Sequence, residues 1–247
     1  MHRNYKYLRF MKKLFLILSI ALTASCLANA QEKTYMNVHQ PNGDDKSFEV
    51  TADLKVTWGA KTEQEVNREE GHRYVDLGLP SGLRWAACNI GAEEPWDYGH
   101  YYCWGEMGVK EDYSLAHYTY KDNPTALPQD KDVAHLSWRG YWRMPTRVDF
   151  KELMEECTWT FERNYHGTHG YVVTGPNGNS IFLPAGGLRN GLNLVLDNEY
   201  GYFWSSSIIN QDHTRGWILR YNNATIDRVD ELRHYGLPVR PVLPAHE

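Results

Sequence analysis

Residues 145–157, PTRVDFKELMEEC, carry the strongest helical signal in the chain. Thr146 stands where a helix N-cap is expected and Asp149 follows three residues later, which is the spacing of a capping box. The apolar positions recur at i, i+3, i+4 and i+7, on one helical face: Phe150, Leu153, Met154 and Cys157. The pattern predicts a helix over 147–157 with Cys157 on its buried face.

Short strands and turns surround this helix in the sequence. A weaker helical pattern covers 132–138, and the loop GPNGN at 175–179 separates two strand-like runs as a hairpin turn would. The expected strands are 73–79, 83–88, 100–104, 171–174, 180–183, 202–206, 216–221 and 237–242. These features predict an α+β fold with a twisted, predominantly antiparallel sheet and about two helices.

A separate segment precedes this unit. Within 31–58, Met36 and Val38 alternate with polar residues, a Pro-Asn-Gly-Asp turn follows, and Phe48 and Val50 alternate again, which predicts a β-hairpin. A further short strand is expected at 54–58. The charged residues 59–71 have no apolar stripe and are interpreted as a linker, so that the main domain spans 72–247.

The first thirty residues have the pattern of a secretory signal peptide. An apolar run from Leu14 to Ala24 is too short to span a bilayer comfortably, and Ala28-Asn29-Ala30 offers a cleavage site before Gln31. The run is preceded by a basic segment: Arg3, Lys6, Arg9, Lys12 and Lys13. We therefore expect an exported protein, with a periplasmic, outer-surface or secreted location.

Two alternatives concern this leader. Met11 is a second candidate start, with residues 1–10 as an extension. Lipoprotein processing at Cys26 is the other, and it fits less well because Thr23 stands where such a site usually has leucine.

Charge and composition exclude several classes of protein. The chain carries 26 Lys and Arg against 31 Asp and Glu, and five of the basic residues lie in 1–30, where there is no acid. Its net charge of −5 therefore becomes −10 after cleavage, which argues against a general nucleic-acid binder. Nine Trp and seventeen Tyr exclude intrinsic disorder, and no later stretch is long and apolar enough for a transmembrane segment.

Cleavage after Ala30 leaves Cys88, Cys103 and Cys157, an odd number without C-x-x-C spacing. This pattern argues against a zinc site, and one disulfide with one spare thiol is the simplest arrangement in an oxidising compartment. We expect Cys88–Cys157, because closing the longer loop constrains the unfolded chain more. The alternatives are a Cys88–Cys103 bond and three buried free thiols.

Six sequence blocks occur in order along the main domain. They are VDLGLPSGLRWAACNIGA (75–92), DYGHYYCWGE (97–106), WRMPT (142–146), GPNGNSIFLPAGG (175–187), YFWSSS (202–207) and VRPV (239–242). Together they resemble the Fibrobacter succinogenes major paralogous domain, a C-type-lectin-like module of exported proteins of Bacteroidota and their relatives. The resemblance covers 72–243, and residues 34–58 resemble the short hairpin that often precedes such modules.

The resemblance implies a C-type-lectin-like fold, with two helices flanking a twisted antiparallel sheet, a long loop region carrying any binding site, and termini close together. This fold is distantly similar to that of the sulfatase-modifying formylglycine-generating proteins. Those enzymes depend on a reactive cysteine pair late in the domain, and no cysteine follows Cys157 here. The serines at 205–207 also lack the G-x-S-x-G turn of a hydrolase. We therefore expect a protein that is not an enzyme and uses no cofactor.

Metal-dependent sugar binding has little support in the sequence. Gln40-Pro41-Asn42 resembles a lectin calcium tripeptide, but it lies in the N-terminal hairpin and no W-N-D block follows. His166 and His169 are spaced for a metal on a helix, yet Gly167 and Gly170 favour a loop. A structural calcium on Asp97, Glu106 or Asp112 is the alternative to a domain without metal.

Aromatic residues with polar neighbours supply the candidate ligand site. Trp96 and Tyr98 open an aromatic segment that ends at Trp104, and such rings suit either a core or a sugar or peptide surface. The charged, proline-containing loop 107–131 favours exposure of its tyrosines. The residues expected to contact a ligand are Tyr113, Tyr118, Tyr120, Trp96, Tyr98, Arg189 and Asn190.

These observations favour a non-catalytic recognition module at the cell surface that binds a glycan or a protein. The alternative is a structural or accessory subunit of a surface assembly, such as a fimbrial tip. A third hypothesis is an enzyme whose site the sequence does not reveal.

Overall fold

The structure is a computed structural model that describes residues 35–38, 46–49, 67–124, 126–209 and 212–245. The chain divides into two units, Met1–Trp58 and Gly59–Glu247. The predicted signal peptide with Cys26, the turn at 39–45, the strand at 54–58 and linker residues 59–66 lie outside the described residues.

In the first unit, β1 (Tyr35–Val38) and β2 (Lys46–Glu49) pair antiparallel, with Tyr35 opposite Glu49 and Val38 opposite Lys46. This is the pairing that the alternation of apolar and polar residues predicts on either side of the turn.

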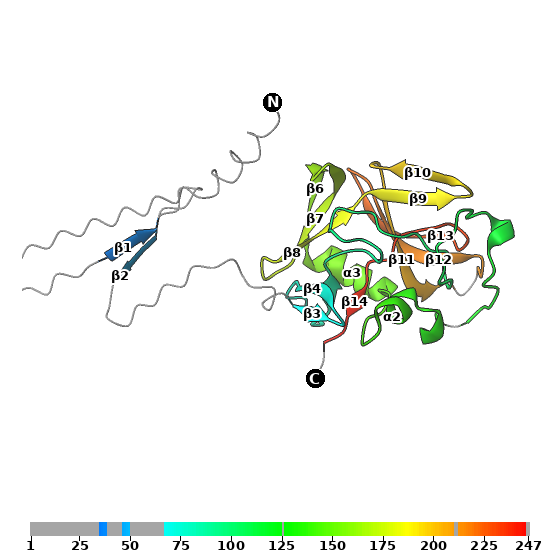
Figure 1. The fold of residues 1–247 in the computed structure, drawn as a ribbon, viewed down its shortest axis with the longest axis horizontal. Coiled ribbons are helices and arrows are strands. Elements are labelled where there is room, and N and C mark those ends of the chain that lie inside the picture. The colour runs from blue at the N-terminus through cyan, green and yellow to red at the C-terminus, as the bar shows by residue number, and fades with distance from the viewer. Residues whose placement is uncertain (1–34, 39–45, 50–66, 125, 210–211, 246–247) are drawn as a thin grey trace, which may run out of the picture. The chain divides into compact units, whose positions relative to one another are not determined.

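The second unit has the α+β fold with antiparallel sheets that the sequence predicts (Figure 1). Its helices are α2 (Val133–Trp138) and α3 (Arg147–Glu156), with 3-10 turns η2 (Leu115–His117) and η3 (Gln129–Lys131). Its strands are β3 (Arg68–Glu69), β4 (His72–Asp76), β5 (Arg84–Ala86), β6 (Thr158–Tyr165), β7 (Thr168–Thr174), β8 (Ser180–Pro184), β9 (Gly186–Asn190), β10 (Asn193–Asp197), β11 (Gly201–Ile208), β12 (Arg215–Tyr221), β13 (Ile226–Leu232) and β14 (Val242–Leu243).

The strands form four small sheets. Their orders are β14-β5-β4-β3, β6-β7-β8, β10-β9 and β11-β12-β13, and every pairing is antiparallel. The first and last of these strands, β3 and β14, lie at opposite edges of one sheet, with β4 and β5 between them (Figure 1). The predicted linker 59–71 extends too far, because β3 already belongs to this sheet.

The capping box of α3 is present as predicted. The Thr146 hydroxyl accepts a hydrogen bond from the Asp149 amide at 3.1 Å, and the Asp149 carboxylate accepts one from the Thr146 amide at 2.6 Å. Phe150 and Leu153 are buried on the face that packs toward β11, β12 and β13. The helix ends at Glu156, so Cys157 is its C-cap rather than its last turn.

Several strands depart from the sequence prediction. Segment 100–104 contributes only an isolated bridge, Tyr102 to Leu237, and 237–242 keeps regular pairing only at β14. The strands β6, β9, β10 and β13 were not predicted. In β6, TWTFERNY, polar and charged residues separate the aromatic ones, and in β13, IDRVDEL, two charged residues separate successive apolar ones. Neither strand has a fully buried residue, so both lack the apolar run of a core strand.

The apolar core has two clusters that are rich in aromatic rings. One includes Trp104, Trp142 and Trp204, and the other includes Trp85 and Phe203, all of them fully buried. The Trp and Tyr content therefore reflects packing first, because such rings bury large apolar areas.

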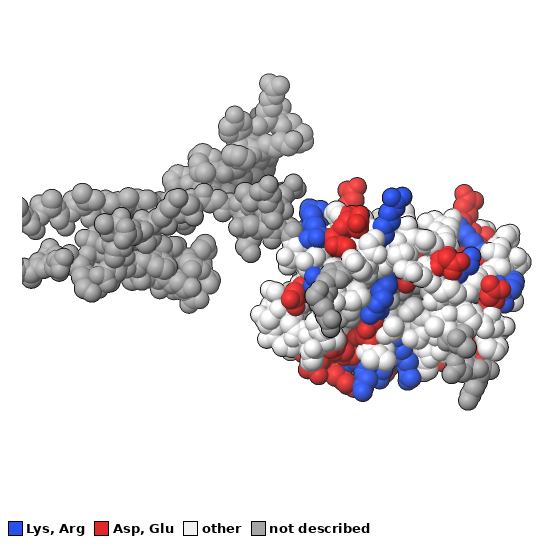
Figure 2. Space-filling view, turned by 90° about the horizontal axis from the view of Figure 1, so that it is seen from below, with Lys and Arg blue, Asp and Glu red and all other residues white. Residues whose placement is uncertain are grey.

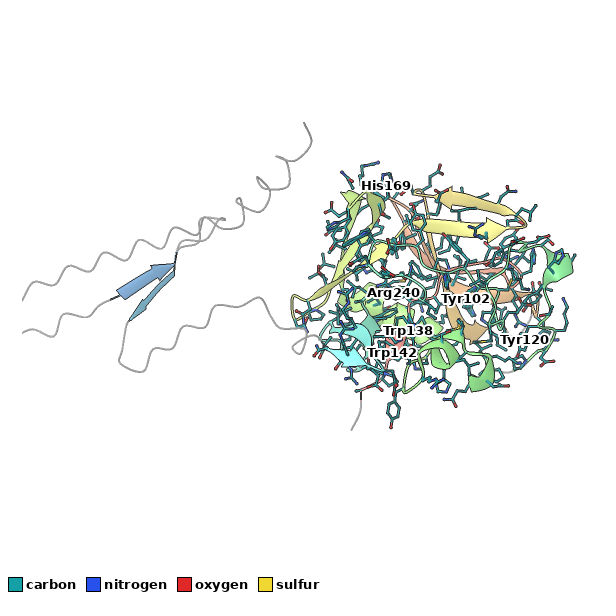
Figure 3. The ribbon with its side chains drawn as sticks, in the orientation of Figure 1. Tyr102, Tyr120, Trp138, Trp142, His169 and Arg240 are labelled. Carbon is teal, nitrogen blue, oxygen red and sulfur yellow. The ribbon has the colours of Figure 1, made fainter. Side chains whose placement is uncertain are left out.

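Arg240 lies in the interior of this domain, near its centre (Figure 3). Its guanidinium donates to the Asn89 side chain at 2.7 Å, to the carbonyls of Ala86 at 3.1 Å and Ala87 at 2.8 Å, and to the Phe182 carbonyl at 2.9 Å. Burial lowers the pKa of Arg240 to about 10, so the group stays charged at neutral pH. One side chain thus connects β8, the residues after β5 and the C-terminal segment.

We expect Arg240→Met to lower the free energy of unfolding by about 3 kcal/mol or more, because it leaves several buried acceptors without a donor. Urea unfolding measures the change. Arg220→Met is the matched control, since Arg220 forms only a surface ion pair with Asp227 at 3.6 Å and its loss costs under about 1 kcal/mol. Equal losses in the two variants would contradict a central role for Arg240.

Candidate functional site

The three loop tyrosines are buried, so the prediction that they are exposed for ligand contact is wrong. Tyr113 is 1% exposed, and Tyr118 and Tyr120 are each 8% exposed. The Tyr113 hydroxyl donates to the Tyr101 carbonyl at 2.7 Å, and the Tyr118 hydroxyl donates to the Trp104 carbonyl at 2.9 Å. These side chains fasten the loop to the aromatic segment instead of facing solvent.

Two further contacts hold the same loop. The Tyr120 ring packs over Gly105, whose φ of +76° and missing Cβ make room for it. The Glu106 carboxylate accepts hydrogen bonds from the Thr119 amide and hydroxyl and forms an ion pair with Lys110. Burial acts to raise the pKa of Glu106, but these bonds outweigh it and hold the pKa below its usual value.

Removing the Tyr118 hydroxyl with Tyr118→Phe should lower the free energy of unfolding by about 1 kcal/mol, because the Trp104 carbonyl loses its donor. Thermal unfolding measures the effect. Tyr200→Phe is the control, since the half-buried Tyr200 stacks on Tyr202 through its ring. If Tyr118→Phe left stability unchanged and altered ligand binding, a structural role for Tyr118 would be wrong.

The fastened loop forms one wall of a cleft of about 440 Å³. The other wall is the hairpin of β9 and β10, whose tip lies beside the green segment in Figure 1, and the Tyr113 amide donates to the Gly191 carbonyl there at 2.9 Å. This volume is within the range of small-ligand sites. We call it the Arg189 cleft, and its lining residues are Gly99, His100, Tyr101, Val109, Lys110, Glu111, Tyr113, Arg189 and Leu192.

The Arg189 cleft combines charge with an apolar rim. Val109 is 55% exposed and Leu192 is 71% exposed, although both are apolar. The Arg189 guanidinium lies over the Tyr101 ring, 5.3 Å from its centroid. Burial raises the pKa of Tyr101, and its hydroxyl donates to the Gly186 carbonyl, so the ring stays neutral and fixed. This arrangement suits a ligand with both polar and apolar surfaces.

Of the predicted contact residues, only Tyr113 and Arg189 line the cleft. Trp96 stacks on His166 with ring centroids 3.9 Å apart, at the turn between β6 and β7. Tyr98 is half-buried against Gly186. Asn190 is exposed and donates to the Tyr235 hydroxyl at 3.4 Å.

Sequence reasoning missed most of the cleft. His100, Val109, Glu111 and Leu192 are ordinary loop residues whose proximity depends on how the loop folds back. Leu192 carried the only local signal, because a leucine beside glycine at a hairpin tip has little to pack against.

The predicted Cys88–Cys157 disulfide is wrong, because Cys88, Cys103 and Cys157 are all free thiols. Cys88 lies within 3.7 Å of the Arg73 guanidinium and 3.5 Å of the Glu93 carbonyl. Burial raises the pKa of Cys103 to about 12 and that of Cys157 to about 11, so both are protonated at neutral pH. The length of the closed loop favoured a bond between Cys88 and Cys157, but the fold does not bring these two cysteines within bonding distance.

We expect the denatured, unreduced chain that lacks residues 1–30 to react with a thiol reagent at three thiols, those of Cys88, Cys103 and Cys157. A disulfide lowers this count by two, which would contradict the free-thiol arrangement. Reduced protein is the control for complete reaction.

No group of three or more His, Cys, Asp or Glu in the part of the chain that the structure describes is arranged to hold a metal ion. The residues considered for calcium are engaged separately, with Asp97 accepting from the Glu94 amide and Asp112 from the Ser114 amide. His169 contacts the Asn198 carbonyl at 2.7 Å, whereas His166 stacks on Trp96.

Ser114, His117 and Asp112 lie together on the surface of the loop. The Ser114 hydroxyl and an Asp112 oxygen both lie 3.0 Å from the same ring nitrogen of His117, Nδ1. A hydrolytic triad needs its serine and its acid on opposite ring nitrogens. This cluster therefore has the residue types of a triad without the geometry.

Surface charge does not form a nucleic-acid footprint on the face shown in Figure 2, where Lys and Arg side chains stand among Asp and Glu side chains. Among the described residues, no helix is both long and apolar enough to cross a lipid bilayer.

Comparisons of the chain with protein-family models, curated proteins and solved structures find no match. The family resemblance therefore stays a prediction.

Proposed function

We propose that this protein is an exported, non-catalytic recognition module of the cell surface, and that it binds a glycan or protein ligand in the Arg189 cleft. The observation that carries the proposal is the cleft itself, where an arginine and two exposed apolar side chains surround a fixed aromatic floor. Binding sites commonly combine an apolar surface with a few placed polar groups on a rigid scaffold.

The rigidity of the walls supports this assignment. On one side, buried tyrosine hydroxyls fasten the loop to the aromatic segment. On the other, Arg189 exchanges two backbone hydrogen bonds with Gly236, at 2.8 and 2.9 Å. A site whose walls are already ordered loses little conformational entropy when it binds a ligand. Export rests on the leader pattern of residues 1–30, and the C-type-lectin-like resemblance favours recognition over catalysis.

We expect the double variant Val109→Ala, Leu192→Ala to weaken ligand retention about tenfold, because it removes the apolar rim of the cleft. Retention of the labelled full-length chain on a glycan array of neutral, amino and acidic sugars measures it. The double variant Leu136→Ala, Val148→Ala is matched, since both residues are exposed and apolar but lie on α2 and α3.

Equal retention by the two double variants would contradict binding in the cleft. Absence of any array signal, together with co-purification with other surface proteins, would favour the role of an accessory subunit in a surface assembly.

A further inference from the structure

Arg189 differs in its contacts from Arg240, Arg143 and Arg215. The guanidinium of Arg240 donates to backbone and amide oxygens, that of Arg143 pairs with Asp149 at 2.6 Å, and that of Arg215 pairs with Asp230. Within the part of the chain that the structure describes, the Arg189 guanidinium has neither a hydrogen-bond acceptor nor a carboxylate partner. Its contact is with the face of Tyr101, so the N–H donors at its edge are free for a ligand.

The backbone beneath Arg189 is held from two sides. Arg189 pairs with Leu194 across the β9–β10 hairpin, and the Arg189 amide and carbonyl both form hydrogen bonds with Gly236. The Arg189 guanidinium carbon lies 5.3 Å from the centroid of the Tyr101 ring, within the range of a cation–π contact. The donors of Arg189 are therefore directed by a rigid element and not by a loop.

The remaining charged and titratable groups around the cleft do not neutralise Arg189. Lys110 is committed to Glu106 and to the His117 carbonyl, which its ammonium reaches at 2.6 Å. His100 directs its Nδ1 toward the Tyr102 hydroxyl at 3.3 Å. Glu111 is exposed and lies outside ion-pair distance of Arg189. Arg189 is thus the unpaired cation of the cleft, and Glu111 is the unpaired anion.

The backbone at the cleft disfavours an added peptide strand. Strand addition needs unpaired amides and carbonyls along an edge. The Arg189 amide and carbonyl are taken by Gly236, and the Tyr113 amide is taken by Gly191. Recognition here therefore depends on side chains: the guanidinium of Arg189 and the apolar rim of Val109 and Leu192.

Building on the proposed function, we propose that the ligand is a glycan that carries a carboxylate, a uronic-acid-containing saccharide, and that Arg189 binds this carboxylate. The planar fork of an arginine matches a carboxylate with two parallel hydrogen bonds. The C–H face of the sugar ring then contacts Val109 and Leu192. Arg189 is in this way the residue that selects acidic over neutral sugars.

Titration calorimetry of the full-length chain tests the proposal with galacturonate and glucuronate oligosaccharides and with their methyl esters, which keep the ring and lose the charge. We expect the acids to bind about tenfold or more tightly than the esters, because charge-assisted hydrogen bonds are lost on esterification. Raising the salt concentration from about 0.05 to about 0.5 M should weaken binding of the acids and leave the esters unaffected.

Four variants separate the role of Arg189 from general effects. Arg189→Gln should reduce binding of the acid to the level of the ester. Glu111→Gln should strengthen binding of the acid, because it removes a like charge from the cleft. Arg163→Gln is the matched control: Arg163 is also a strand arginine over an aromatic ring, Phe161 at 5.8 Å, but it does not line the cleft. Arg189→Lys serves as a second variant that keeps the charge without the fork.

The outcomes distinguish this inference from the proposed function on which it rests. Equal binding of acid and ester, with loss of both in the Val109→Ala, Leu192→Ala variant, overturns the carboxylate and leaves the cleft as a binding site. Tighter, Arg189-dependent binding of an aspartate-rich peptide overturns the glycan. Absence of binding to every saccharide overturns the proposed glycan recognition itself.

Discussion

The burial of the Arg240 guanidinium is the constraint on which the described domain depends. A charged group in a protein interior is costly unless acceptors surround it, and here four backbone or amide oxygens do so. Those oxygens belong to segments far apart in the chain, at and just after the end of β5 and in β8. The sheet that contains β5 and the sheet that contains β8 are therefore joined by one polar centre as well as by the aromatic core.

Buried side chains also hold the loop that follows the aromatic segment, through hydrogen bonds to backbone carbonyls. Tyr113 and Tyr118 bury their rings in the core and use their hydroxyls to satisfy carbonyls of the segment they cover. A long connection without regular structure is thereby made rigid. The loop held in this way forms one wall of the Arg189 cleft, and its Tyr113 amide also bonds to the Gly191 carbonyl at the tip of the opposite wall.

The predictions that the structure confirms are those that depend on residues close together in the sequence. The capping box of Thr146 and Asp149 was predicted correctly, because its partners lie three residues apart. The disulfide and the exposure of Tyr118 were not, since both depend on where distant segments meet. The rings of the aromatic segment and the following loop were predicted to suit a core or a ligand surface, and six of them are buried: Tyr101, Tyr102, Trp104, Tyr113, Tyr118 and Tyr120. At the cleft, Arg189 was predicted, Tyr113 lies in the wall but is buried instead of exposed as predicted, and the apolar rim was not predicted.

By itself, the sequence determined the antiparallel α+β class, the helix that begins after Thr146 and the hairpin of β7 and β8, because apolar periodicity and turn residues act within a few positions. Only the tertiary structure decided which charged groups are paired. Lys110 forms an ion pair with Glu106, four residues away, and Arg240 donates hydrogen bonds to oxygens of distant segments. Arg189 lies over the face of an aromatic ring. The sequence does not show whether an arginine has an acceptor, because the acceptors come from residues that only the folded chain brings close to it.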